Sequence, residues 1–141
     1  MNVTPVPSEN PLISFPKQRC WAVVGVSDHR EKYGNIIFRA LRDAGYRVYA
    51  IHPKLTEVEG HQVYQHITDL PEVPDVVDFV IPPQAVPPML HECATHGVKR
   101  VWFQPGSESP EALALAASLG LQAVSDACIL IQQQQWDEDA V

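Results

Sequence analysis

The chain has 141 residues and a net charge of −7, with 10 Lys and Arg against 17 Asp and Glu. This length suits one domain with its own core, and the acidic balance argues against a nucleic-acid-binding surface. No apolar run approaches the ~18–20 residues that span a bilayer, and residues 1–16 lack the pattern of a signal peptide, so we expect a cytoplasmic protein with no membrane partner.

The two ends of the chain differ from its centre. Residues 1–18 contain prolines at positions through which a regular helix cannot run, so we expect a proline-rich, extended N-terminal arm. Residues 132–141 begin with glutamines and end in acidic residues, and we expect a frayed tail there. The folded domain is therefore predicted to span residues 19–131.

The first half of this domain predicts two strands separated by a helix. Residues 20–26 form an apolar, β-branched run that is typical of a buried strand. Apolar residues at helical spacing follow over residues 34–44, and residues 47–51 again resemble a strand. Residues 53–74 show no long periodic pattern and predict a loop, a hook and one helical turn.

The second half repeats the alternation. Buried strands are predicted over residues 75–81 and 98–103, with a helix over 85–96 between them. A second helix starts after Ser109, a suitable N-cap followed by Pro110, and it ends near residue 120. Residues 121–124 form the last predicted strand.

Three glycines mark the points where a helix returns to a strand. Gly45, Gly97 and Gly120 each follow a helical segment and precede a strand, as left-handed C-caps do. Strands that alternate with helices form parallel sheets through right-handed crossovers. We therefore predict a Rossmann-like α/β fold, a doubly wound parallel sheet of about five strands with helices on both faces.

Ligands of such sheets bind beyond the carboxyl ends of the strands. The first such loop runs from Gly25 to Asn35, where Gly25 and Gly34 would let the backbone approach a ligand and the helix N-terminus would favour a phosphate. The spacing is not GxGxxG, so the standard NAD fingerprint is absent. A loop with tight turns and no ligand would have the same composition.

The second strand ends at His52-Pro53-Lys54, where an NAD site would have an acid for the ribose. A lysine there suits a phosphorylated ribose, as in NADP or coenzyme A, although a single lysine also occurs as an ordinary surface residue. The third strand ends at Ile81-Pro82-Pro83, which would form a rigid apolar ledge for an adenine or mark the entry to a helix. Gln104 ends the fourth strand and would contact a ligand or cap a helix.

Other chemistry has weaker support in the sequence. The pairs His61/His66 and His91/His96 are five residues apart and do not share a helix face, so no metal site is predicted. Nucleophile and P-loop motifs are absent, and we assign no catalytic residue. Three cysteines without a CxxC spacing favour reduced, structural thiols.

Several motifs together resemble a known family. They are WAVVGVS (21–27), IHPK (51–54), GHQVY (60–64), TDLPEVPDVVDFVIPP (68–83), VWFQPG (101–106) and SDAC (125–128). In order and spacing they are similar to the small bacterial and archaeal coenzyme A-binding proteins, which resemble the coenzyme A-binding domain of the succinyl-CoA synthetase alpha subunit. The resemblance covers residues 20–131.

The resemblance implies a ligand role for most of the strand ends. The loop from residue 25 to 32 would hold phosphates, Lys54 the ribose 3′-phosphate, and residues 81–83 the adenine, while residues 102–104 would follow the pyrophosphate or pantetheine arm. The expected cofactor-binding residues are Gly25, Val26, Ser27, Arg30, Lys32, Tyr33, His52, Pro53, Lys54, Ile81, Pro82, Pro83, Trp102 and Gln104.

The chain also departs from the family pattern. The family usually has Asn-Pro-Lys where this chain has His52-Pro53-Lys54, and it often has a basic residue where this chain has Ala127. The family's N-terminal helix is expected to be replaced here by the proline-rich arm. Fewer cations near the site predict weaker phosphate binding.

Three functions fit these observations. The first is a stand-alone module that binds coenzyme A or an acyl-CoA without intrinsic catalysis. The second is an NADP-binding redox protein, which would need a substrate site that the sequence does not indicate. The third is a scaffold protein whose nucleotide site has degenerated. A homodimer suits a domain of this size, although the sequence does not specify one.

Overall fold

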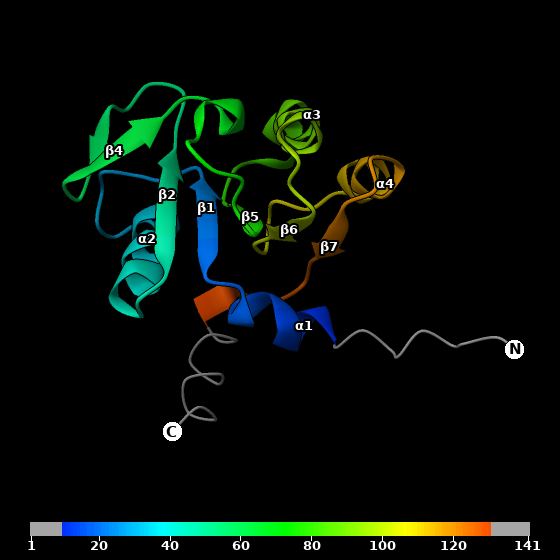
Figure 1. Ribbon diagram of the computed structural model, residues 1–141, viewed down its shortest axis with the longest axis horizontal. Helices are drawn as coiled ribbons and strands as arrows, with labels where there is room; N and C mark the ends of the chain where they lie inside the picture. Colours follow the sequence, from blue (N-terminus) through cyan, green and yellow to red (C-terminus); the bar gives the residue numbers. More distant parts are fainter. Residues whose placement is uncertain (1–9, 131–141) are drawn as a thin grey trace, which may run out of the picture.

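The computed structural model of the chain describes residues 10–130 and places them in a seven-stranded sheet with helices on both faces (Figure 1). The strand order is β3-β4-β2-β1-β5-β6-β7. The strands are β1 (Cys20–Val24), β2 (Arg47–Ile51), β3 (Glu57–Val58), β4 (His61–Tyr64), β5 (Val76–Phe79), β6 (Arg100–Phe103) and β7 (Gln122–Val124).

The five predicted strands are confirmed as β1, β2, β5, β6 and β7, and all of them pair in parallel. The sheet has two further strands where a loop and a hook were expected. β3 and β4 form a short antiparallel hairpin, and β4 also pairs in parallel with β2. Both strands are largely exposed, with Glu57, His61 and Gln62 on the surface, so no apolar run marks them in the sequence.

The three predicted long helices are also confirmed. They are α2 (Tyr33–Asp43), α3 (Val86–His96) and α4 (Pro110–Ser118). The Ser109 hydroxyl accepts the Ala112 N–H at 3.0 Å and thereby caps α4. Gly97 adopts a left-handed φ of 91° directly after α3, as expected for a glycine that turns the chain back to the sheet.

The helices divide the hydrophobic core into two layers, one on each face of the sheet. α2 packs Ile37, Phe38 and Leu41 against one face, where Trp21 and Trp102 are also buried. α3 and α4 cover the other face, where their apolar residues meet Phe79 and Phe103. The ring centroids of these two phenylalanines lie 5.3 Å apart in a stacked pair. Because both faces are covered, the carboxyl edge of the sheet is the place where a ligand can reach the strand ends.

The N-terminal segment differs from the extended arm that the sequence predicted. Residues 10–18 form two short helical turns, α1 (Pro11–Ser14) and the 3-10 turn η1 (Phe15–Lys17). The prolines sit in the first turns, where no N–H is needed, so they begin these turns and do not prevent them. Phe15 is buried against Trp102, at 6.4 Å between ring centroids. The predicted tail, residues 132–141, lies outside the described residues.

Two further 3-10 turns position the loops at the carboxyl edge. They are η2 (Ile67–Asp69), which is the single helical turn predicted within residues 53–74, and η3 (Pro83–Ala85), which leads directly into α3. No helix within the described residues has the length and apolar character needed to cross a membrane.

Candidate functional site

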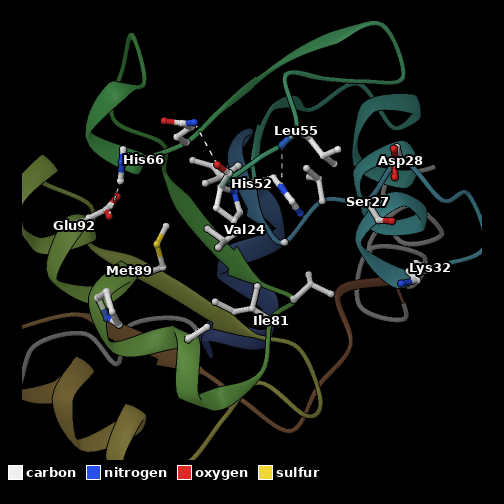
Figure 2. A pocket seen from close by; sticks show the side chains of 18 of the residues that line it. Val24, Ser27, Asp28, Lys32, His52, Leu55, His66, Ile81, Met89 and Glu92 are labelled. Carbon is white, nitrogen blue, oxygen red and sulfur yellow. Dashed lines mark hydrogen bonds and ion pairs between the residues drawn. The ribbon is translucent and has the colours of Figure 1, made fainter.

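A cavity of about 730 Å³ lies at the carboxyl ends of β1, β2 and β5 (Figure 2). We call it the main cavity. Its lining comes from the loop 25–32, residues 51–55, residues 65–66, and the segment from residue 80 into α3. Its volume falls in the range of small-molecule sites, about 300–1,000 Å³. The structure therefore brings together three of the strand ends that the sequence singled out.

The two glycines of the first loop serve packing within the protein. A Cβ on Gly25, whose φ is 100°, would lie 2.3 Å from the Val80 carbonyl oxygen. A Cβ on Gly34 would lie 2.1 Å from the Gly25 carbonyl oxygen. We expected these glycines to let a ligand approach the backbone closely. Instead, neighbouring protein backbone packs against them, and this packing holds β1, β5 and the start of α2 together.

The loop that follows Gly25 presents polar groups to the main cavity. Ser27 Oγ accepts the His29 N–H at 3.0 Å, and buried Asn35 donates its side-chain N–H to the Ser27 carbonyl at 2.8 Å. Among the described residues, no partner accepts a hydrogen bond from the backbone N–H of Ser27 or Asp28. Of the residues expected to bind a cofactor in this loop, Gly25, Val26, Ser27 and Lys32 line the cavity.

Two other residues predicted in this loop lie elsewhere. The guanidinium of Arg30 lies 3.4 Å from the carboxylate of Glu59, on the β3–β4 turn, and Arg30 does not line the main cavity. Tyr33 is 67 % exposed and borders a separate cavity of about 160 Å³. Glu59 also lies 3.7 Å from the guanidinium of Arg42. Its two ion pairs therefore connect the β3–β4 hairpin to α2 and to the loop that bears Arg30.

The second strand end turns sharply around an imidazole. His52 Nδ1 accepts the backbone N–H groups of Lys54 and Leu55 at 3.0 and 3.1 Å. Burial lowers the pKa of His52. His52 and Pro53 line the main cavity, whereas Lys54 lies on the exposed surface beside them.

The apolar wall of the cavity differs in part from the predicted ledge. Ile81 lines the main cavity, but Pro82 and Pro83 line a shallower one of about 500 Å³ that they share with residues 105–107. This wall also includes Ala85, the last residue of η3, and Pro88 and Met89 in the first turn of α3. The sequence indicated a helix over these residues but not which of its faces would meet the cavity.

A His–Glu pair lies at the far end of the cavity from Lys32 (Figure 2). His66 Nδ1 lies 3.0 Å from Glu92, and the other carboxylate oxygen of Glu92 accepts the Ile67 N–H at 2.9 Å. The hydrogen bond to Glu92 raises the pKa of His66. This pair could not be recognised in the sequence, because the two residues are 26 positions apart and belong to no common motif.

The structure does not bring Trp102 or Gln104 to the main cavity. Trp102 is fully buried in the core, and its indole N–H donates to the Ala127 carbonyl at 2.8 Å. The Gln104 amide N–H group donates to both carboxylate oxygens of Asp78 at 2.9 Å, and its oxygen accepts the Ile129 N–H at 3.3 Å. Asp78 is fully buried, and this burial raises the pKa of its carboxyl well above the usual range.

The cysteines and histidines do not form a further reactive centre within residues 10–130. Cys20 and Cys93 are buried, Cys128 is half-buried, and all three are free thiols. Burial raises the thiol pKa of both Cys20 and Cys93, which makes them poor nucleophiles. Over the same residues no group of three His, Cys, Asp or Glu side chains converges as a metal site would require.

Comparison with protein-family models matches residues 19–134 to the CoA binding domain. An ADP-forming acetate–CoA ligase from Methanocaldococcus jannaschii is 36% identical over 87 residues, a match that covers 62% of this chain and 12% of the ligase. The chain thus spans a small part of the length of that relative.

Two solved structures have the same fold over most of their length. A hypothetical protein from Pyrococcus horikoshii OT3 superposes with a TM-score of 0.86 at 27% identity, covering 96% of this chain and 98% of that one. A conserved hypothetical protein from Pyrococcus furiosus is 36% identical with a TM-score of 0.78, covering 81% of this chain and 98% of that one.

Proposed function

The chain belongs to the CoA-binding domain family, and from this premise we propose that it binds coenzyme A in the main cavity as a binding module without catalytic chemistry of its own. The observation that carries the proposal is the division of this cavity into a polar loop and an apolar wall. Coenzyme A has the matching division, with phosphates next to a flat adenine ring.

The polar loop supports binding of the diphosphate. The backbone N–H groups of Ser27 and Asp28 have no acceptor among the described residues, and Lys32 adds a positive charge to the same lining. Unpaired backbone N–H groups in a tight loop bind anions well because their dipoles converge on one point. The same lining also contains the carboxylates of Asp28 and Glu92, so the N–H groups and Lys32 would hold the phosphates against these negative charges.

The apolar wall supports binding of the adenine. Ile81, Ala85, Pro88 and Met89 supply aliphatic and thioether surface on one side of the cavity. An aromatic base that lies on this surface removes apolar area from water, and a sulfur near a ring edge adds a favourable contact. The wall thus suits a base better than it suits a charged group.

Lys54 supports the choice of coenzyme A over dephospho-coenzyme A. It lies exposed beside the lining residues His52 and Pro53, where the 3′-phosphate of a nucleotide in this cavity would reach the surface. An ammonium group there is a mobile point charge and suits a phosphate at the rim of a site.

Isothermal titration calorimetry of the full chain tests the proposal. We expect saturable heat with coenzyme A, a weaker affinity for dephospho-coenzyme A, and none with NADP under the same conditions. The absence of saturable heat with coenzyme A would sink the proposal and favour a scaffold protein. Equal affinities for coenzyme A and its dephospho form would remove the role assigned to Lys54.

A further inference from the structure

His52 closes the turn that follows β2. Its backbone N–H donates to the Tyr64 carbonyl at 3.0 Å, which continues the pairing of β2 with β4. Its side chain then folds back, and Nδ1 accepts the N–H groups of Lys54 and Leu55 at 3.0 and 3.1 Å. A single ring nitrogen therefore satisfies two backbone donors of the turn.

These two contacts determine where the ring carries its proton. A nitrogen that accepts hydrogen bonds from two N–H groups has no room for a hydrogen of its own, so the ring hydrogen must be on Nε2. Adding a second proton would place an N–H against two other N–H groups and break the turn. Partial burial of the ring opposes the cation as well and lowers the pKa of His52.

The opposite edge of the same ring is open to the main cavity. His52 lines that cavity, and Figure 2 shows the imidazole between Leu55, whose N–H it accepts, and the loop that bears Ser27. Within residues 10–130 no acceptor contacts Nε2. The turn thus presents one oriented N–H donor to the space where a ligand would bind.

We infer that His52 acts as a neutral hydrogen-bond donor to a phosphate oxygen of the bound nucleotide, while its Nδ1 keeps the turn over residues 52–55 closed. This inference rests on the proposed binding of coenzyme A. An N–H in a fixed position loses little conformational freedom when it binds an anion, and a hydrogen bond to a charged acceptor is worth more than one to a neutral acceptor.

Charged and titratable groups line the same cavity as the ring or lie beside it. Asp28, His29 and Lys32 belong to the loop after β1, Lys54 belongs to the same turn as His52, and His66 and Glu92 lie across the cavity. A neutral His52 keeps the same charge over the pH range in which these groups titrate. The contact of His52 with an anion should therefore keep its strength while the other groups titrate.

Two substitutions separate the donor from the turn. In His52→Asp the carboxylate can accept the same backbone N–H groups, as aspartate does in Asx turns, but it has no N–H to donate. In His52→Asn the side-chain oxygen accepts these groups and the amide N–H can replace the ring donor. We expect both variants to keep the wild-type Tm, and His52→Asp to bind coenzyme A between about tenfold and about a hundredfold more weakly than His52→Asn. His52→Ala, which adds no charge and loses both functions, should lower both the Tm and the affinity. Equal affinities in His52→Asp and His52→Asn would show that the role of His52 is structural only and would overturn the inference.

The pH profile distinguishes a neutral donor from a histidinium ion. The ratio of the wild-type and His52→Asn affinities for coenzyme A should stay constant from about pH 6.5 to about pH 8.5, because the other titrating groups are common to both proteins. A ratio that falls toward one as the pH rises would identify a cationic contact and contradict the inference.

Nitrogen NMR of the ligand-free protein provides a test that needs no ligand. The ¹⁵N shifts of the His52 ring should show a protonated Nε2 and an unprotonated Nδ1 at neutral pH, and coenzyme A should move the Nε2 signal. The opposite tautomer would refute the inference whether or not the nucleotide binds. If the tautomer is as stated but the wild type binds no coenzyme A, the proposed function fails and the donor has no phosphate to contact.

Discussion

The carboxyl edge of the sheet has an open half and a closed half. The open half follows β1, β2 and β5 and contains the main cavity, into which Ser27, Lys32 and His52 project. The half that we call closed follows β6 and β7. It borders the two smaller cavities, of about 500 and 160 Å³, but its Gln104 side chain bonds to Asp78 and Ile129 within the protein. Both halves carry polar residues at strand ends, and both looked like candidate sites in the sequence.

The two halves differ in what their polar groups bind. In the closed half the protein itself provides the partners, as when Ser107 Oγ donates to the Ile81 carbonyl at 2.6 Å and accepts the Ile81 N–H at 3.1 Å. In the open half the backbone N–H of Ser27 and Nε2 of His52 have no partner among the described residues. A position at this edge therefore indicates a binding site only where polar groups remain available to a ligand.

The largest expected effect comes from removing the internal hydrogen bonds of the closed half. Gln104→Leu keeps the size of the side chain but leaves the buried Asp78 carboxyl and the Ile129 N–H without their partner. We expect a loss of about 3 kcal/mol or more in the free energy of unfolding, measured by urea denaturation. Gln84→Leu, the same change at an exposed position, should cost less than about 0.5 kcal/mol. Similar losses in both variants would contradict the assignment of Gln104 to the core.

The next effect concerns the protonation of the buried Asp78 carboxyl, the partner of Gln104. Burial raises the pKa of Asp78, so the folded protein binds this proton more tightly than the unfolded chain does. The stabilising contribution of this group is then complete below about pH 4 and is lost as the pH rises toward the folded-state pKa.

Asp78→Asn removes this dependence. Above about pH 4, the stability of the variant relative to the wild type should increase by about 1.4 kcal/mol per pH unit until the folded-state pKa is reached. Denaturation at a series of pH values measures the difference. A difference that stays constant with pH would mean that Asp78 titrates alike in the folded and unfolded chains.

A smaller effect, on binding alone, is expected in the open half. Lys54→Ala should lower the affinity for coenzyme A about tenfold and leave that for dephospho-coenzyme A unchanged, because only the 3′-phosphate contact is removed. Lys99→Ala, an exposed lysine before β6 at the opposite edge of the sheet, is the matched control and should bind both nucleotides as the wild type does. A loss of Tm in Lys54→Ala would instead assign a structural role to this lysine.

The smallest effect is electrostatic and local to the far end of the main cavity. Glu92→Gln removes the carboxylate that raises the pKa of His66, so this pKa should fall toward its ordinary value. An NMR titration of the histidine ring protons measures the change, and the signals of His52 serve as an internal reference. An unchanged pKa of His66 would show that the pair does not form in solution.

Local signals in the sequence were sufficient for most of the fold. Ser109 and Pro110 placed the start of α4, and Gly97 placed the end of α3, because caps and turns depend on residues close together in the chain. The N-terminal segment was predicted wrongly because the burial of Phe15 depends on Trp102, a residue far away in the sequence. The same limit explains why the pairing of β4 with β2 was missed.

The sequence by itself determined the alternation of strands and helices, the parallel sheet and the loops at its carboxyl edge, since periodicity and turn chemistry are local properties. Only the tertiary structure decided which of those loops are open. It paired Gln104 with Asp78 and left the Nε2 edge of His52 facing the main cavity. The physical reason is that a polar side chain is available to a ligand only when folding brings no internal partner to it, and those partners come from distant parts of the chain.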